Sequence, residues 1–426
     1  MFRTMDTFVI EGGAPLRGSV RVAVSKNSAL PILAATLLVE GETRLEGVPA
    51  LRDVDTLLRL LRALGCAVER NADGSITVAA QDLTPCEAPY DIVKEMRASF
   101  CVLGPLVARR GRARVSLPGG CNLGVRPIDL HLKGLRALGA RLHVDGGYVE
   151  AQGPLRGEEM FLAGAFGSTV LGTANVLMAA ALAPGRSVIE AAACEPEVAD
   201  LARFLVACGA RISGIGSPRL EIEGVTSLRG TRWRPIPDRM EAGTFLAAAA
   251  ITGGDVTVEG ASADHMGAVI ETLREAGCAV ERRPEGIRLR GPDRPKPIEV
   301  TTYPYPGFPT DLQAPITSLA TVADGMSVFT EKIYPERFMH VPELNRMGAN
   351  VRKHETSSIV HGVKSLSGAE VMASDIRGGA SLLVAGLAAR GTTTVHRVYH
   401  VDRGYDAIEE KLAALGARVR RVAEAG

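Results

Sequence analysis

Long apolar stretches are missing from this chain of 426 residues. A helix needs about 20 consecutive apolar residues to cross a bilayer, and the longest apolar runs here, such as that within Ala247–Ile251, are far shorter. The first residues, MFRTMDTFVIEGG, also lack the apolar segment of a secretory signal. We therefore predict a cytoplasmic protein that is neither exported nor inserted in a membrane.

A surplus of charge of either sign is absent too. The 49 Lys and Arg residues nearly balance the 48 Asp and Glu residues, which leaves a formal net charge of +1. Such a chain has no general attraction to nucleic acid or to an anionic membrane, so any anion site must come from local clusters of Arg and Lys. The 46% hydrophobic fraction is that of a globular protein rather than a disordered one.

Cysteine pairs with metal-binding or redox spacing are also lacking. The seven cysteines include no CxxC motif, and their odd number indicates free thiols in a reducing compartment. The sequence has no Walker A motif, no GxGxxG after a strand and no HExxH. We therefore expect no metal and no cofactor, and no obligate protein partner is evident.

One pattern is repeated six times along the chain. Each copy has the end of a helix, a glycine, a small residue and the start of a strand: LRALGCAV, LRALGARL, LVACGARI, LREAGCAV, LNRMGANV and LAALGARV. The glycines, 68 to 74 positions apart, are Gly65, Gly139, Gly209, Gly277, Gly348 and Gly416. A helix that turns sharply into a strand needs a residue that tolerates positive φ, so we predict six copies of one structural unit.

A second element has the same period. It is an alanine- and leucine-rich helix that runs into a glycine turn and a β-branched strand, as in LMAAALAPGRSVIEAA. We expect this helix to be buried, with sheets close to it on several sides. Six copies in a chain of this length predict two domains of three repeats each. Two prolines and the only Trp fall within Arg232–Asp238, which indicates the boundary.

Residues that the repeat pattern does not require, most of them polar or charged, fall at only two positions within the repeat, called phases here. The first phase is the start of the alanine-rich helix, with Lys26, Asn27, Arg97, Gly167, Ser168, Asp238, Arg239, Asp311, Asp375 and Arg377. The second is the loop that leads from the middle strand into the second helix, with Cys121, Arg126, Arg337 and Arg403. Helix N-termini attract anions, so basic residues added there predict a site for phosphates and carboxylates. The alternative for each Arg is a solvated charge or a salt-bridge partner.

Cys121 differs from the other cysteines in its setting. Cys66 and Cys278 occupy a position where other repeats carry alanine, which indicates a core role. Cys194 shares the loop phase, but Glu195 and Glu197 beside it are expected to raise its pKa. Cys121 follows two glycines and precedes Arg126 and a helix start, which favours the thiolate. We predict Cys121 as the reactive thiol.

These motifs resemble the UDP-N-acetylglucosamine enolpyruvyl transferases nearly end to end. The matching segments include SKNSALP, MRASF, PGGCNLGVRPIDLH, PDRMEAGTF, FPTDLQA, ERFMHVPEL and HVDRGYDAIEEKL. The resemblance implies an inside-out α/β barrel fold, with two globular domains each made of three βαβαββ-type units. It implies a first domain at residues 21–235, which carries the Cys121 loop, a second at residues 1–20 plus 236–426, and an active site in the cleft between them.

The resemblance also implies the reaction. The enolpyruvyl group of phosphoenolpyruvate would pass to the 3'-hydroxyl of UDP-N-acetylglucosamine with release of phosphate, the first committed step of peptidoglycan synthesis. Cys121 matches the general acid and Asp311 the acceptor of the hydroxyl proton. The residues matched to the phosphoenolpyruvate site are Lys26, Asn27, Arg126 and Arg403, of which Lys26 and Arg403 also match catalytic positions.

Further positions match the binding site of the sugar nucleotide. They are Arg97, Arg126, Pro127, Ile128, Asp129, Leu130, Gly167, Asp311 and Ile333. The supporting positions are Arg337, matched to a closing residue, and Asp375 and Arg377, matched to residues near the reacting groups. The segment AGAFGSTV departs from the family, which commonly has Lys or Pro and Ser where this chain has Ala163 and Ala165.

Two alternatives remain at this stage. A sister enolpyruvyl transferase could use another acceptor, such as shikimate 3-phosphate or a different nucleotide, although the shikimate enzyme lacks the cysteine loop. A repeat protein that only binds a UDP-sugar would keep the cations, but it has no use for both Cys121 and Asp311.

Overall fold

The six repeats are present in the structure, a computed structural model that describes residues 6–81, 83, 85–119 and 128–423. The six predicted glycines each follow a helix and have φ between 86° and 108°. These helices are α2 (Arg52–Ala63), α5 (Asp129–Ala137), α7 (Pro196–Ala207), α9 (Gly267–Glu275), α11 (Val341–Arg346) and α13 (Ile408–Ala414). At the first, Gly65 N–H donates to Arg62 O and Cys66 N–H to Leu61 O, both at 3.0 Å. This pairing closes the helix and explains the glycine followed by a small residue.

The alanine-rich helices form the interior of the repeats. They are α1 (Lys26–Ala35), α4 (Leu103–Arg110), α6 (Val170–Ala180), α8 (Arg239–Ile251), α10 (Thr310–Ala320) and α12 (Ile376–Ala388). Every residue of α8 is buried. These inner helices also pack against one another, which the sequence did not indicate. A Cβ at Gly104 of α4 would lie 2.2 Å from Asn175 O of α6, and one at Gly243 of α8 would lie 2.3 Å from Leu312 of α10. Small residues therefore permit close helix–helix approach.

Each repeat contributes a four-stranded sheet with one parallel pair and two antiparallel pairs. Three sheets have the orders β18 (Arg232–Trp233), β4 (Glu42–Leu45), β6 (Ile76–Ala79), β5 (Ala67–Arg70); β7 (Glu87–Ala88), β8 (Arg112–Ser116), β10 (Tyr148–Gln152), β9 (Arg141–Asp145); and β11 (Glu159–Phe161), β14 (Arg186–Glu190), β16 (Arg219–Glu223), β15 (Arg211–Ser213).

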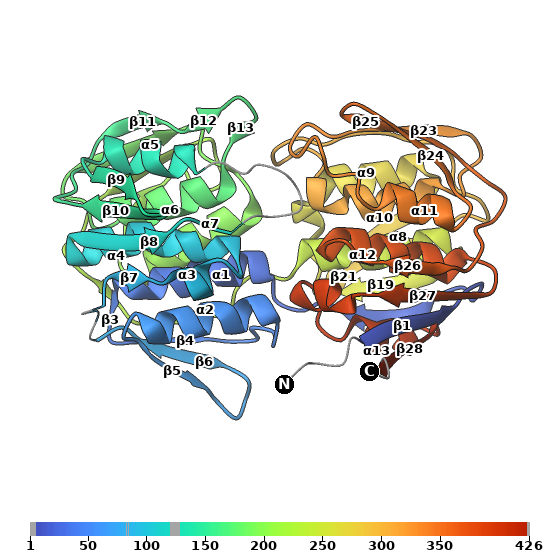
Figure 1. The fold of residues 1–426 in the computed structure, drawn as a ribbon, viewed down its shortest axis with the longest axis horizontal. Coiled ribbons are helices and arrows are strands. Elements are labelled where there is room, and N and C mark those ends of the chain that lie inside the picture. Colours follow the sequence, from blue (N-terminus) through green and yellow to red (C-terminus); the bar gives the residue numbers. More distant parts are fainter. Residues whose placement is uncertain (1–5, 82, 84, 120–127, 424–426) are drawn as a thin grey trace. The chain divides into compact units, whose positions relative to one another are not determined.

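The other three sheets have the same arrangement. Their orders are β2 (Arg17–Arg21), β19 (Asp255–Glu259), β21 (Gly286–Arg290), β20 (Ala279–Arg283); β22 (Glu299–Thr301), β23 (Met326–Thr330), β25 (Ser357–His361), β24 (Asn350–His354); and β26 (Glu370–Met372), β27 (Thr392–His396), β1 (Asp6–Glu11), β28 (Arg418–Ala423). Figure 1 shows strands along the outside of each unit, with helices between them. The predicted βαβαββ repeat and inside-out α/β fold are confirmed.

Short elements complete the chain. They are η1 (Thr36–Leu38), β3 (Val39–Glu40), α3 (Tyr90–Val93), η2 (Arg97–Val102), β12 (Ala163–Gly164), β13 (Gly167–Ser168), β17 (Leu228–Arg229), η3 (Ala263–His265) and η4 (Val398–Arg403). β3 pairs with β17, and β12 pairs with β13 in a hairpin. Within residues 6–119 and 128–423, apart from 82 and 84, we find no helix that is both long and apolar enough to cross a membrane.

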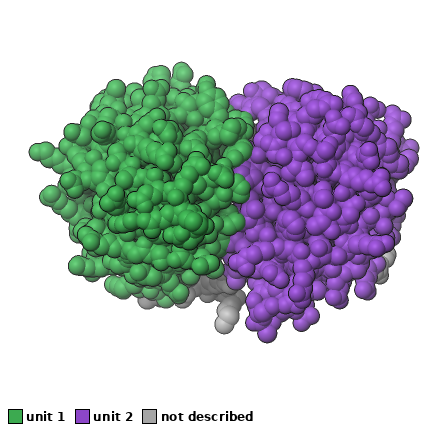
Figure 2. Space-filling view, turned by 180° about the vertical axis from the view of Figure 1, so that it is seen from behind, with its two compact units in different colours: residues 1–23, 122–124, 237–426 green, residues 24–121, 125–236 purple. Residues whose placement is uncertain are grey.

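The chain divides into two compact units, coloured separately in Figure 2. Unit 1 contains the described residues of 1–23 and 237–426, and unit 2 contains the described residues between 24 and 236. Each unit has its own hydrophobic core, built around α8, α10 and α12 in unit 1 and around α1, α4 and α6 in unit 2. The predicted domains, 21–235 and 1–20 plus 236–426, have boundaries close to those of the two units. Their assignment as functional domains stays a prediction.

A buried histidine ties the second and third repeats of unit 2 together. The Asn175 side chain of α6 donates to Phe100 O at 3.3 Å, accepts from Gly104 N–H at 2.7 Å and lies 3.1 Å from Nδ1 of His131. Burial, with the charge of Arg97, lowers the pKa of His131 to about 3. A neutral ring that accepts at Nδ1 satisfies this contact, since the Asn175 nitrogen is a donor.

We expect this histidine to make stability depend on pH. Its folded pKa lies below the unfolded value near 6.5, so the unfolded state binds more protons as the pH falls, and stability is lost from about pH 6.5 downwards. The loss approaches about 1.4 kcal/mol per pH unit. Urea unfolding at two pH values should show a shallower dependence for His131→Asn, which keeps an acceptor near the Nδ1 position. Equal slopes for the two proteins would contradict the prediction.

A second prediction concerns a glycine at the end of β16. A Cβ at Gly224 would lie 1.7 Å from Ala183 O, and the clash is with backbone, so the contact cannot relax by a rotamer change. Gly224→Ala should therefore lower the free energy of unfolding by about 1–3 kcal/mol or more. Gly267, the first residue of α9, has no atom within 4 Å of the same position. Gly267→Ala is the matched control, and its melting temperature should stay or rise; equal losses would refute the steric argument.

Candidate active site

The predicted polar residues lie at the starts of inner helices. Lys26 is the first residue of α1, and Asp311 is the second residue of α10. Asp375 caps α12, where its Oδ1 accepts from the backbone N–H of Arg377 at 2.9 Å. Arg97 begins η2, which runs directly into α4. The side chains thus stand where the helix N–H groups are free of intrahelical partners.

Asp311 lies between two buried arginines in unit 1. Arg337 Nη1 donates to Oδ1 at 2.7 Å, and Arg377 donates to Oδ2 from Nε at 3.1 Å and from Nη2 at 2.9 Å. The arginine side chains are 6% and 2% exposed, whereas that of Asp311 is 27% exposed. Two cations thus share one carboxylate that still reaches solvent.

The electrostatics of this cluster favour charged side chains. Burial by itself would raise the pKa of Asp311, but the charges of Arg337 and Arg377 and their hydrogen bonds hold it well below its ordinary value. Asp311 is therefore ionised at any physiological pH. Arg377 Nη1 and Arg337 Nε are buried and have no hydrogen-bond partner among the described residues. The cluster keeps donor capacity that a bound anion could use.

His340 is buried in the same unit, where it interacts electrostatically with Asp375 and Arg337. Burial lowers its pKa to about 4, the charge of Arg337 adds to that effect, and Asp375 opposes it. Its ring stacks on Phe338 with centroids 6.5 Å apart. The ring is thus neutral at physiological pH, which suits a supporting role better than proton transfer.

Lys26 forms a buried ion pair in unit 2. Its Nζ lies 2.7 Å from Asp53 Oδ2 of α2, and the two side chains are 5% and 7% exposed. Asn27, the next residue of α1, is half-buried. The ammonium group is thus held at a fixed place by a partner from the neighbouring helix, which limits the rotamers of its long side chain.

The loop after β8 is the part of the predicted site that the structure describes least. Cys121, Arg126 and Pro127 lie outside the described residues. The stretch that follows is placed: Ile128 precedes α5, Asp129 is its exposed first residue, and Leu130 is half-buried.

Gly167 lies in the β12–β13 hairpin, close to the start of α5. It pairs with Gly164 and has φ +87°. A Cβ at Gly164 would lie 3.5 Å from Leu130, so the hairpin and the start of α5 are neighbours. The structure therefore brings together two segments that the sequence analysis assigned to one ligand.

The remaining predicted residues belong to loops of unit 1. Arg403 is the half-buried last residue of η4. Ile333 is half-buried, and its N–H donates to Glu331 Oε1 at 2.9 Å. Arg337 lies four residues further along the same segment, which follows β23. These placements agree with the second phase of the repeat.

Sequence reasoning missed Asp53 and Glu331. Asp53 looked like one of the acidic residues common in the first turn of a helix, so only the structure pairs it with Lys26. Glu331 is fully buried and stands at the loop phase beside Ile333, a signal that could have found it.

Five of the other cysteines are disfavoured as reactive thiols, because each has a raised pKa. Cys66, Cys101, Cys208 and Cys278 are buried, and burial raises the pKa of each to about 12. The pKa of Cys194 is also raised, in the predicted direction; burial is the larger cause and the charge of Glu195 the smaller one. Across the part of the chain that is described, no group of three His, Cys, Asp or Glu side chains is placed to hold a metal ion.

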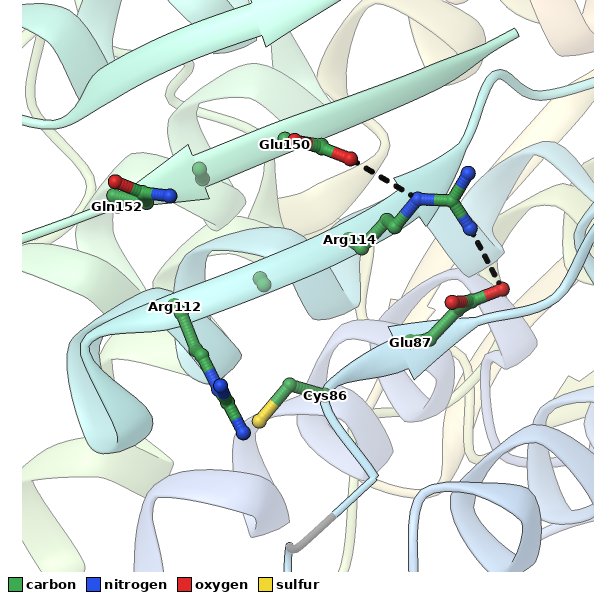
Figure 3. A pocket seen from close by; sticks show the side chains of 8 residues that line it. Cys86, Glu87, Arg112, Arg114, Glu150 and Gln152 are labelled. Atoms are coloured by element: carbon green, nitrogen blue, oxygen red, sulfur yellow. Dashed lines mark hydrogen bonds and ion pairs between the residues drawn. The ribbon is translucent and has the colours of Figure 1, made fainter. Parts of the chain in front are cut away.

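A shallow pocket lies elsewhere, on the sheet that contains β8 and β10. Its volume is about 300 Å³, and it is lined by Cys86, Glu87, Arg112, Ala113, Arg114, Glu150, Ala151 and Gln152. Figure 3 shows these side chains from close by. Arg114 is neutralised there by ion pairs with Glu87 and Glu150 at 2.9 and 3.2 Å. None of the predicted site residues lines this pocket.

Comparison with known structures supports the fold. The enolpyruvyl transferase NikO from Streptomyces tendae superposes with a TM-score of 0.89 at 24% identity, over 99% of this chain and 100% of that one. The EPSP synthase from Acinetobacter baumannii superposes with a TM-score of 0.74 at 22% identity, over 98% and 100%. At these identities the likeness concerns the fold alone.

Comparison of sequences is more specific. A model of the family described as EPSP synthase (3-phosphoshikimate 1-carboxyvinyltransferase) matches residues 10–412. The chain is 55% identical to the UDP-N-acetylglucosamine 1-carboxyvinyltransferase of Anaeromyxobacter sp. (strain Fw109-5), over 98% of this chain and 99% of the relative. It is 51% identical to the protein of that name from Methylacidiphilum infernorum (isolate V4), over 98% and 99%. The chain therefore belongs to the EPSP synthase family of enzymes and, within it, groups with the UDP-N-acetylglucosamine 1-carboxyvinyltransferases.

Proposed function

We propose that the protein transfers the enolpyruvyl group of phosphoenolpyruvate to the 3'-hydroxyl of UDP-N-acetylglucosamine and releases phosphate, as the first committed step of peptidoglycan synthesis. The observation that carries the proposal is 55% identity, over 98% of the chain, to a relative whose name states this carboxyvinyl transfer. The cysteine loop PGGCNLGVRPIDLH, which the shikimate enzyme lacks, also favours a sugar nucleotide as the acceptor.

Phosphoenolpyruvate carries a phosphate and a carboxylate, so its site needs several cations. We assign this task to Lys26, Arg126 and Arg403, with Asn27 beside them. Arginine binds phosphate or carboxylate through two parallel hydrogen bonds, whereas lysine acts as a point charge. The buried pair of Lys26 with Asp53 supports the assignment, because a lysine held in one place loses less freedom when an anion binds.

The chemistry is an addition followed by an elimination. Cys121 gives a proton to C3 of phosphoenolpyruvate while the sugar 3'-oxygen bonds to C2, and Asp311 takes the hydroxyl proton. The product of this step is a tetrahedral ketal that still carries the phosphate. A proton then passes from C3 back to Cys121, which the first step left deprotonated, and the double bond is restored as the C2–O bond to phosphate breaks. Acid and base must each come within hydrogen-bond reach of the proton that they move.

The pKa of Asp311 sets a condition on this scheme. A carboxylate with a strongly lowered pKa is always ready to accept a hydrogen bond from a hydroxyl, but it is a weak base. We propose that Arg337 or Arg377 turns toward a substrate anion during the reaction, which would raise the proton affinity of Asp311. Their buried unpaired nitrogens support this proposal.

The sugar nucleotide takes the remaining residues. We assign it Arg97, Arg126, Pro127, Ile128, Asp129, Leu130, Gly167, Asp311 and Ile333. Arg337, Asp375 and Arg377 act as supporting residues. The neighbouring hairpin and α5 start support a single binding segment, in which Ala163 and Ala165 stand where the family commonly has Lys or Pro and Ser. The proposal requires residues of both units to act on one substrate pair, and it needs no metal or cofactor.

We predict that fosfomycin, an epoxide that mimics phosphoenolpyruvate, alkylates Cys121 through the thiolate that forms when this residue loses the proton it would otherwise give to C3. Intact-mass spectrometry with peptide mapping should find one adduct on wild type and on the control Cys194→Ala, but none on Cys121→Ala. Cys121→Ala should still bind UDP-N-acetylglucosamine in calorimetry, with turnover reduced by about 100-fold or more. An adduct on another cysteine would remove the assignment.

Asp311→Asn should reduce phosphate release from phosphoenolpyruvate and UDP-N-acetylglucosamine by about 10²–10⁴-fold, because the amide cannot take the hydroxyl proton. The control is Asp324→Asn, which removes a carboxylate that pairs with Arg294 on the surface at 2.8 Å and should leave the rate unchanged. Melting curves separate lost chemistry from lost stability. Phosphate release with another sugar nucleotide, and not with this one, would redirect the proposal to a sister acceptor.

A further inference from the structure

Glu331 is a fully buried carboxylate, directly after β23, with four hydrogen bonds and no assigned role. Its two oxygens have different partners. Oε1 accepts from Thr302 Oγ1 at 2.6 Å and from the backbone N–H groups of Ile333 and Tyr334, both at 2.9 Å. Oε2 accepts from Thr310 Oγ1 at 2.9 Å. One side chain therefore fixes a loop through one oxygen and the start of α10 through the other.

The Oε1 side determines the shape of the segment that contains Ile333. The backbone N–H groups of Ile333 and Tyr334 both donate to this one carboxylate oxygen, as in the first turn of a capped helix. Thr302 strengthens the same anchor, because its hydroxyl donates to Oε1 and accepts from Lys332 N–H at 2.9 Å. Three consecutive residues, 332 to 334, are thus tied to the Thr302–Glu331 pair.

The Oε2 side leads to the charge cluster. Thr310 has a single hydroxyl hydrogen, and a carboxylate can only accept, so this hydrogen must face Glu331. The lone pairs of Thr310 Oγ1 are then free for Arg337 Nη1, which donates to it at 3.1 Å and to Asp311 Oδ1 at 2.7 Å. In Glu331→Gln, an amide NH2 group could replace Oε2 and donate a hydrogen bond to Thr310 Oγ1. The Thr310 hydroxyl hydrogen would then turn toward Arg337, where two donor hydrogens would face each other.

We propose that Glu331 is a positioning residue with two separable tasks, an inference that rests on the proposed function. Through Oε1 it holds the Ile333 segment for the sugar nucleotide. Through Oε2 and Thr310 it aims Arg337 at Asp311 for proton transfer. Binding and chemistry are thus linked at one carboxylate.

The two threonines allow the tasks to be tested separately. Thr302→Val and Thr310→Val each remove one hydroxyl that donates to Glu331 and keep the side-chain shape. Thr302→Val should raise KM for UDP-N-acetylglucosamine about fivefold or more with kcat within about twofold of wild type. Thr310→Val should lower kcat about tenfold or more with KM little changed. Glu331→Gln should do both.

Two further variants serve as controls. Thr330→Val removes the contact of Thr330 Oγ1 with Ser357 Oγ at 3.1 Å, next to Glu331 in the chain but not bonded to it, and should leave both constants unchanged. In an Arg337→Ala background, Thr310→Val should cause no further loss of kcat, because its effect passes through Arg337.

The outcomes distinguish this inference from the proposed function. If Thr302→Val and Thr310→Val change kcat and KM by the same factors, and these changes follow their losses of melting temperature, then Glu331 is only a structural anchor. Additive losses in the Arg337→Ala background would overturn the Oε2 task. A wild-type enzyme that releases no phosphate from phosphoenolpyruvate and UDP-N-acetylglucosamine would instead reject the proposed function. If Glu331→Gln fails to fold, the threonine variants still decide.

Discussion

A helix that is buried on every side can meet a polar ligand only at its ends. The inner helices of both units are of this kind, since their alanines and glycines let neighbouring helices come close and leave no solvent-facing stripe. Unsatisfied N–H groups collect at the starts of these helices, and the chain places its unusual side chains there. The fold thus determines where chemistry can occur before any particular residue is chosen.

The cost of burying charge in unit 1 is offset because Asp311, Asp375 and Glu331 each interact with more than one partner. Asp311 serves two arginines, Asp375 caps α12 and influences His340, and Glu331 accepts from four donors. Removing one member would leave another charge buried without its partner, which costs more than the pair contributes. Arg377 Nη1 and Arg337 Nε are buried without a hydrogen-bond partner among the described residues, so the network keeps unused donor capacity.

The repeats could be predicted from the sequence because they rest on local chemistry. The sequence shows directly each glycine that must adopt positive φ and the small residue after it, and the spacing of these pairs predicts the six units. Lys26 and Asp311 stood out by their phase for the same reason. Asp53 and Glu331 did not, because their roles come from partners that only the folded chain brings near. The Cys121 loop stays a prediction, since Cys121 lies outside the described residues.

The sheet order of unit 1 has a consequence for synthesis on the ribosome. Strand β1, made first, has its two partners in β27 and β28, which are made last. The described part of unit 2 lies between these segments in the chain and holds all the strands of its three sheets. Unit 2 can therefore close while translation continues, whereas β1 has neither of its strand partners until β27 and β28 have been made. During that interval the unpaired edges of β1 can pair with a strand of another nascent chain.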